Sequence, residues 1–93
     1  MSGVKVLFFT SPTCGPCKVV KPTIEELQED YGQFEWTHVD TSNDHGNFAT
    51  KLHVRLVPTL VVVKPDGTEL GRHEGTSLIG YFNLLRRAKA LLL

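Results

Sequence analysis

The two cysteines of the chain, Cys14 and Cys17, are separated by only two residues. A disulfide between them would close a ring of only a few residues, for which chain entropy contributes about 2 kcal/mol, against about 3 kcal/mol for a fifteen-residue loop. The pair therefore makes more sense as chemistry than as a structural staple. The chemistry that two neighbouring thiols support is reversible thiol–disulfide exchange.

Metal binding is the main alternative for two cysteines at this spacing. A structural zinc ion needs four ligands, usually with a second close pair. The histidines are scattered singly, at His38, His45, His53 and His73. We therefore expect no metal site and interpret these four side chains as solvated surface residues.

The segments around the cysteines predict a strand followed by a helix. Val4–Phe9 is apolar and β-branched, which is typical of a buried strand, and residues 11–13 break it. From Cys14 to about Tyr31 apolar residues recur at helical spacing, with Pro22 inside the run, where it should kink the helix. Cys14 would then lie at the helix N-terminus, whose unpaired N–H groups and dipole favour an anion. That position should lower its thiol pKa from about 8.5 toward neutrality.

The position of the two thiols along this helix assigns them different roles. Cys14 at the N-terminus would attack a target disulfide, and Cys17, one turn inside and shielded from water, would resolve the product. Gly15 allows close approach of another chain's backbone. Pro16 suits the first helical turn, where its missing N–H costs nothing.

The remaining segments complete an α/β pattern. Phe8 and Phe9 are core candidates that should face opposite sides of the sheet. A last helix should follow Gly75 and bury Leu78, Phe82 and Leu85. The other predicted elements are strands at 34–39, 59–64 and 68–73, a short helix near 44–52, and a hairpin turn at 65–67. The order β-α-β-α-β-β-α predicts a mixed four-stranded sheet with helices on both faces.

Length and composition limit the class of protein. The chain has 93 residues, which predicts one domain over residues 1–93. Ten Lys and Arg balance ten Asp and Glu, so no basic surplus points to nucleic acid or to an anionic membrane. Its apolar runs are too short to span a bilayer, and residues 1–9 do not resemble a signal peptide. We therefore expect a soluble, cytoplasmic monomer.

The chain resembles the thioredoxin family over nearly all of its length. The pentapeptide at residues 14–18, which ends in Lys18, matches the family active site. Pro22 falls where thioredoxins kink the same helix, and the Val57-Pro58-Thr59 segment matches the family's cis-proline segment. Gly75 stands where the family carries a glycine after its last strand. A lone CxxC motif would be weak support, but the combination of these features is specific.

The resemblance implies roles for residues far from the cysteines. Pro58 would form a cis peptide bond and lie against Cys14 and Cys17. A proline beside the sulfurs should also keep the site free of metal. The backbone of Val57 could then pair with a substrate strand. Gly15, Pro16, Val57, Pro58, Gly75 and Thr76 would form the substrate-contact patch.

The chain departs from the family pattern at positions that matter for proton transfer. Thr13 replaces the tryptophan that usually precedes the first cysteine, and Phe8 replaces a buried aspartate. Trp36 stands, on our alignment, where a lysine neighbours that aspartate. The usual water-mediated proton relay to Cys17 is therefore missing. No histidine is a convincing substitute, because all four lie away from the motif in sequence.

The resemblance implies a dithiol–disulfide oxidoreductase that reduces protein disulfides. It would bind no cofactor and would receive electrons from NADPH through a flavin-dependent reductase. Only three residues precede the first predicted strand, so we do not expect the extra N-terminal strand and helix of full thioredoxins. Such a short form resembles glutaredoxin-like thioredoxins and the small redoxins that serve ribonucleotide reductase, which makes that enzyme a candidate partner.

Two alternatives to a thioredoxin-type reductase remain open. One is a glutaredoxin-type enzyme that is recycled by glutathione, although no Pro-Tyr pair stands between the cysteines as in most glutaredoxins. The other is a binding module that keeps the fold but no longer turns over. A thioredoxin-type enzyme would be recycled by a flavin reductase, and a glutaredoxin-type enzyme by glutathione. Reduction of insulin disulfides would distinguish either enzyme from a binding module.

Overall fold

The structure, a computed structural model, describes residues 3–92 of the chain. Its elements follow the order expected from the sequence, with strand boundaries that differ by one residue. They are β1 (Lys5–Thr10), α1 (Gly15–Asp30), β2 (Glu35–Asp40), α2 (Phe48–Lys51), β3 (Thr59–Val63), β4 (Glu69–Glu74) and α3 (Leu78–Leu91).

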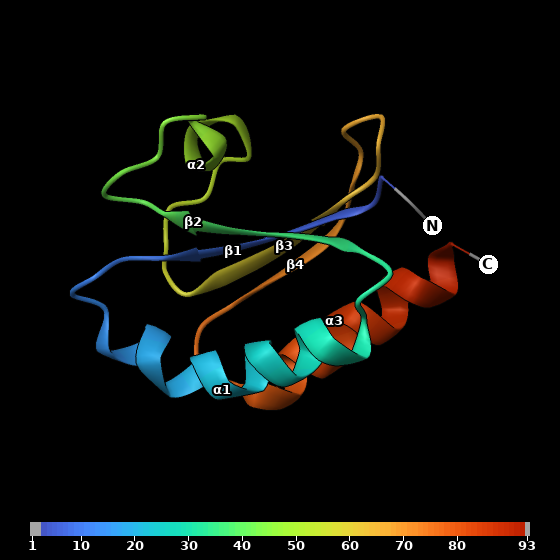
Figure 1. Cartoon of the computed structure of the whole chain (residues 1–93), viewed down its shortest axis with the longest axis horizontal. Coiled ribbons are helices and arrows are strands. Elements are labelled where there is room, and N and C mark those ends of the chain that lie inside the picture. Colours follow the sequence, from blue (N-terminus) through green and yellow to red (C-terminus); the bar gives the residue numbers. More distant parts are fainter. Residues whose placement is uncertain (1–2, 93) are drawn as a thin grey trace.

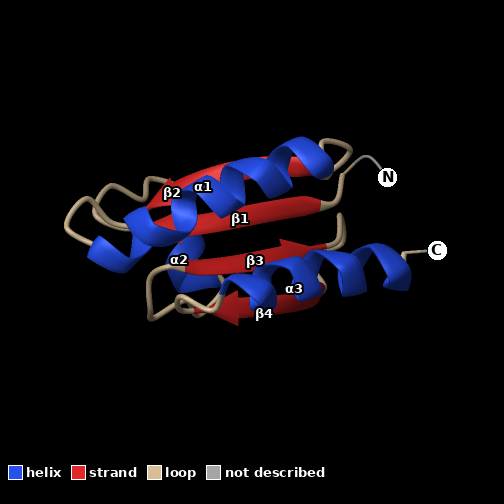
Figure 2. Ribbon diagram, turned by 90° about the horizontal axis from the view of Figure 1, so that it is seen from below, coloured by secondary structure: helices blue, strands red, loops and turns tan. Residues whose placement is uncertain are grey.

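The four strands form one mixed sheet in the order β2-β1-β3-β4. β1 and β2 are parallel, as a helical crossover requires, while β1 with β3 and β3 with β4 are antiparallel. The long helices α1 and α3 cover one face of this sheet, and α2 lies over the other (Figure 1). Seen from the helical side, α1 and α3 run along the sheet beside one another (Figure 2). The predicted fold class is confirmed.

The two central strands carry the core because they are covered on both faces. Every residue of β3 is buried, and residues 6–9 of β1 are buried as well. Alternate side chains point to opposite faces. Phe8 packs into the larger apolar cluster beneath α1 and α3, whereas Phe9 belongs to the smaller cluster on the α2 side. The predicted division of this aromatic pair between the two faces is confirmed.

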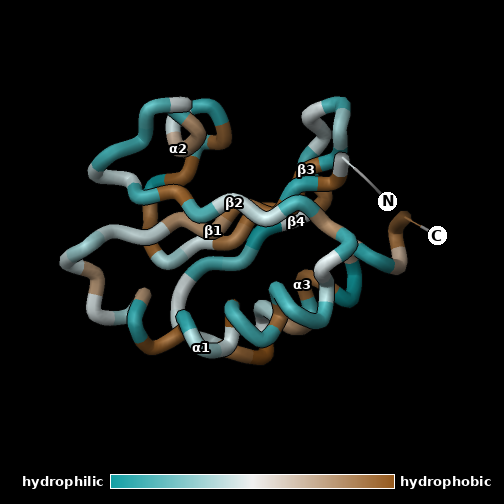
Figure 3. Tube along the Cα trace, in the orientation of Figure 1, coloured by the Kyte–Doolittle hydropathy of each residue, from teal (hydrophilic) through white to brown (hydrophobic). Residues whose placement is uncertain are grey.

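Helix α1 packs against the sheet through one apolar stripe. Val20, Ile24 and Leu27 are fully buried, as their spacing predicts, and charged residues occupy the opposite face. Figure 3 shows this alternation of hydrophobic and hydrophilic residues along both α1 and α3. The helix runs from Gly15 to Asp30 with the exposed Pro22 inside it.

Helix α3 buries a different stripe from the predicted one. Leu85 is buried as expected, but Leu78 is exposed and Phe82 only half-buried. Tyr81, which the predicted stripe did not include, takes their place. Its ring is fully buried, because the hydroxyl donates a hydrogen bond to the carbonyl of Gly75. The buried residues of α3 are Tyr81, Leu84, Leu85 and Ala88.

The expectation of four solvated histidines is wrong for one of them. His38, His45 and His53 are exposed, but His73 is half-buried against α3. Its ring meets that of Tyr81 edge-on, with 4.5 Å between centroids, and its Nε2 is 3.0 Å from the carbonyl oxygen of Ser77. The ring occupies the space above Gly80, where any Cβ would overlap it. His73 therefore fixes the start of α3 to β4.

Candidate active site

The two cysteines lie at the N-terminus of α1 and form a disulfide. Cys14 is the N-cap residue, and its Sγ accepts a hydrogen bond of 3.0 Å from the backbone N–H of Cys17. Their Cα atoms are 5.3 Å apart, within the usual range for a disulfide. The predicted position of Cys14 at a helix N-terminus is confirmed. A backbone donor already points at its sulfur, so a thiolate there would be stabilised.

Exposure differs between the two sulfur-bearing residues in the expected direction. Cys14 is half-exposed, whereas Cys17 is buried at 4% exposure. Gly15 and Pro16 are both exposed, and a Cβ placed on Gly15 would meet nothing within 4 Å. The surface around Cys14 is therefore open to another chain, and Cys17 is covered by the helix and the sheet.

The segments predicted to contact substrate lie at the same edge of the sheet as the cysteines. The register pairs Phe9 with Thr59, and Thr59 in turn with Glu74. The chain after β1, the chain before β3 and the chain after β4 therefore meet at one edge, which is seen on the left of Figure 1. The peptide bond between Val57 and Pro58 is cis, as the resemblance implied.

The loop before β3 and the loop after β4 are joined by a backbone hydrogen bond. The N–H of Gly75 donates to the carbonyl of Pro58 at 3.0 Å. Gly75 has a φ of +95°, a conformation that a side chain would strain. Its carbonyl accepts the hydrogen bond from Tyr81. Tyr81 thereby anchors, through Gly75, the segments that carry Val57 and Thr76.

This tether predicts a loss of stability at high pH. Burial, and then the negative charge of Glu74, raise the pKa of Tyr81 to about 12. The folded chain thus keeps the phenolic proton above pH 10, where the unfolded chain loses it, so the free energy of unfolding should fall between about pH 10 and pH 12. Tyr81→Phe should remove the part of this decrease in the free energy of unfolding that comes from the phenol, and leave the part that comes from other titrating groups. Urea unfolding across this pH range measures it, with Tyr31→Phe as the control that should behave as wild type.

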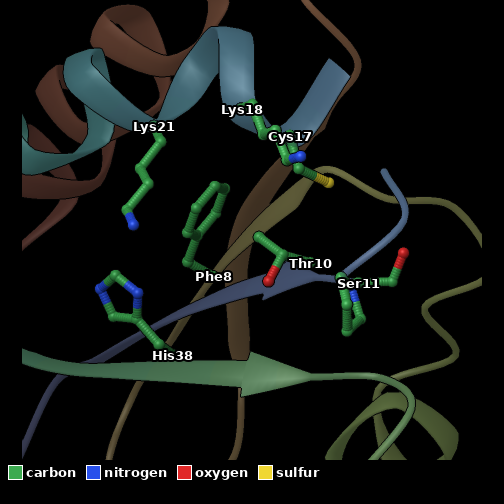
Figure 4. Close-up of a pocket in the computed structure, with 8 residues that line it drawn as sticks. Phe8, Thr10, Ser11, Cys17, Lys18, Lys21 and His38 are labelled. Carbon is green, nitrogen blue, oxygen red and sulfur yellow. The ribbon is translucent and has the colours of Figure 1, made fainter. Parts of the chain in front are cut away.

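Behind Cys17 lies a cleft of about 200 Å³ between α1 and the first two strands. Its floor is the ring of Phe8, which is 1% exposed and belongs to the larger core. Figure 4 shows Lys21 reaching from α1 toward His38 on β2, with Phe8 between that pair and Thr10. The lining residues are Phe8, Thr10, Ser11, Pro12, Cys17, Lys18, Lys21 and His38.

His38 lies away from the motif in sequence, but it lines the same cleft as Cys17. Phe8 and His38 are direct neighbours in the parallel β1–β2 register, so their side chains share a face of the sheet. Their rings meet edge-on with 5.7 Å between centroids. The sequence carried a clue in the alternation of β2, because the buried Val39 forces His38 onto the opposite face, toward α1.

Trp36 lies on the same face of β2 but contributes to the core. It packs against the larger apolar cluster, and its Nε1–H donates to the carbonyl of Tyr31 at 3.0 Å. Thr13 is exposed on the loop before the cysteines.

Within residues 3–92 no three His, Cys, Asp or Glu residues come together as a metal site. In the same residues, none of the helices has the length and hydropathy that a membrane-spanning helix needs.

Comparison with known proteins agrees with this geometry. The sequence model of the thioredoxin family matches residues 2–80. Thioredoxin from Staphylococcus haemolyticus is 39% identical over 75 residues, which cover 80% of this chain and 70% of that protein. Thioredoxin from Staphylococcus aureus strain Mu50 is 37% identical over the same coverage.

Solved structures with the same fold include one from an animal parasite and one from a plant. Thioredoxin of Fasciola hepatica superposes with a TM-score of 0.82 at 28% identity, covering 94% of this chain and 83% of that chain. The short form of thioredoxin F from spinach chloroplast superposes with a TM-score of 0.81 at 27% identity, covering 92% and 76% respectively.

Proposed function

The chain belongs to the thioredoxin family, and from this premise we propose that Cys14 and Cys17 carry its reaction. The activity itself, oxidoreduction of protein disulfides, follows from the family and from a CxxC pair at disulfide distance. The observation that supports the assignment of roles is the asymmetry of the pair. Cys14 is half-exposed and receives an N–H at the helix N-terminus, and Cys17 is buried one turn further along.

The proposed reaction begins with both thiols reduced. The thiolate of Cys14 attacks one sulfur of a substrate disulfide, forming a mixed disulfide and releasing the other substrate sulfur as a thiolate. The thiolate of Cys17 then attacks the sulfur of Cys14. The bond to the substrate breaks, the second substrate thiol leaves, and the Cys14–Cys17 disulfide forms. The substrate has gained two electrons, and the cysteine pair has lost them.

We propose that the substrate strand lies across the edge where the two tethered loops meet. Val57 is half-buried before the cis bond, so its backbone can pair with an extended peptide. Gly75 and the exposed Thr76 flank it, and the open space beside Gly15 and Pro16 accommodates the other side of the peptide. Lys18 supports the site by placing a cation at its rim.

Trapping tests the proposed roles of the two cysteines. Cys17→Ser can begin exchange but cannot finish it, so protein substrates should remain covalently attached through Cys14. We expect adducts that disappear on addition of dithiothreitol and that do not form with Cys14→Ser, in which Cys17 is the remaining thiol. Equal capture by Cys14→Ser would refute the assignment of Cys14 as the nucleophile. Identification of the captured proteins also tests ribonucleotide reductase as a partner.

Thioredoxins in general hold no cofactor and are returned to the dithiol form by a reductase. For this chain we propose electrons from NADPH through a flavin-dependent reductase, with glutathione as the alternative. Mixing the oxidised protein with each system distinguishes them: NADPH consumption with a thioredoxin reductase supports the first, and efficient reduction by glutathione alone supports the second.

We also propose a single domain over residues 1–93 that acts as a monomer in the cytoplasm, for which the bacterial relatives and the lack of a surplus charge give support.

A further inference from the structure

The resolving cysteine needs a proton acceptor that the reaction described above does not supply. A neutral thiol is a poor nucleophile, so Cys17 must lose its proton before it attacks the mixed disulfide. Burial at 4% exposure disfavours the thiolate and separates Cys17 from bulk water. Phe8, which lines the cleft beside Cys17, cannot accept a proton. A side chain in the cleft beside Cys17 is the alternative to direct transfer into solvent.

The cleft behind Cys17 contains one suitable acceptor. Among residues 3–92, three titratable side chains line it besides Cys17, namely Lys18, Lys21 and His38, and no carboxylate does. A lysine ammonium group offers three N–H donors and no acceptor. Imidazole is the side chain that exchanges a proton near neutrality. At about 200 Å³ the cleft has room for several water molecules, which could connect Cys17 to His38.

The ring of His38 is held in a position that leaves one nitrogen free. Its Nε2 lies 3.2 Å from Oε1 of Gln28, and this contact is a hydrogen bond in the tautomer that carries its hydrogen on Nε2. Nδ1 then keeps a free lone pair. Edge-on contact with Phe8, at an interplanar angle of 86°, limits rotation of the ring. After Nδ1 gains a proton the bond to Gln28 persists, so both protonation states fit this arrangement.

The other titratable groups near His38 are two carboxylates that already accept hydrogen bonds, a second histidine, and two lysines. On its outer side, a shallow groove also contains Asp40, Asp44 and His45. Asp40 accepts hydrogen bonds from Ser42, which lower the pKa of its carboxyl, and Asp44 accepts the N–H groups that start α2. On the α1 side the charges are Lys18 and Lys21, which favour a negative charge on Cys17.

From this arrangement we propose that His38 accepts the proton of the Cys17 thiol, through water in the cleft, during resolution of the mixed disulfide. The S–H bond of Cys17 breaks, its proton passes along the water to Nδ1, and the resulting thiolate attacks Cys14. The departing substrate thiolate takes a proton from the imidazolium or from solvent, which restores neutral His38. The assignment rests on the proposed roles of the two cysteines.

Stopped-flow reaction of the reduced protein with an equal concentration of a chromogenic aromatic disulfide separates the two steps. The first release of coloured thiolate reports attack by Cys14 and depends on concentration. The second reports attack by Cys17 and does not. For His38→Gln at pH 7 we expect an unchanged first phase and a second phase at least about tenfold slower. His53→Asn is the control, since His53 is exposed, lies outside the cleft and has a φ of 56° that asparagine tolerates.

The dependence on pH distinguishes proton transfer from a structural role. The second phase of wild type should level off at a lower pH than that of His38→Gln, which should keep rising and meet wild type above about pH 9. A second phase in His38→Gln equal to wild type at pH 7, or a loss of both phases at every pH, would overturn the role of His38. A wild-type protein with no second phase would instead contradict the proposed function. Because His38 is exposed on an edge strand, Gln and Asn can both replace it, and His38→Asn serves as the second variant.

Discussion

Cys14→Ser is expected to abolish catalysed disulfide reduction, so the initial rate of insulin reduction should fall to that of dithiothreitol alone. The serine hydroxyl does not ionise near neutral pH and cannot form a disulfide, so no mixed disulfide arises. The helix N-terminus and the N–H of Cys17 remain, which isolates the effect of the sulfur. Turbidity from precipitating insulin chains measures the rate.

Two control variants show whether the loss of activity is specific to the sulfur of Cys14. Cys17→Ser should also fail to turn over, but it should still react once and retain the substrate. Thr13→Ser changes an exposed neighbour of the motif and should keep wild-type activity. If wild type reduced insulin no faster than Cys14→Ser, the chain would have to be regarded as a binding module that retains only the fold.

Phe8→Ala should produce the largest loss of stability, about 3–5 kcal/mol. Phe8 is 1% exposed on the central strand β1 and packs with Ile24 and Leu60 in the larger cluster, so its removal leaves a cavity open to the cleft. A domain of this size has a total stability of about 5–10 kcal/mol. Thermal and urea unfolding should therefore show a variant close to the limit of folding.

Val19→Ala provides the matched control for Phe8→Ala. Val19 is 62% exposed on α1 and lies outside both apolar clusters. Its truncation should change the free energy of unfolding by less than about 0.5 kcal/mol. A loss for Phe8→Ala no greater than for Val19→Ala would show that the β1 side of the core does not carry the stability assigned to it.

The features that the sequence predicted correctly are those encoded locally. The strand before Cys14, the helix after it and the hairpin at 65–67 each follow from periodicity and turn residues within a short window. The cis bond at Pro58 followed from resemblance to a family rather than from any local pattern. The resemblance alone implied that the cysteines and the segments around Pro58 and Gly75 come together.

The features that the sequence did not predict depend on contacts between distant segments. The approach of His38 to the cleft requires the exact pairing of β1 with β2, which no single segment specifies. The buried stripe of α3 depended on whether Tyr81 could bury its ring, and that depends on the carbonyl of Gly75. His73 is covered only because Gly80 leaves room above α3.

The acidity of Cys14 underlies the whole account, and alkylation of the reduced protein measures it directly. Iodoacetamide labelling of the two thiols, followed residue by residue with mass spectrometry from about pH 5 to pH 10, gives the ionisation of each. We expect Cys14 to reach half of its maximal rate near neutral pH and to react far faster than Cys17 at pH 7. A profile for Cys14 that matches a free thiol, near pH 8.5, with labelling no faster than that of Cys17, would contradict the account.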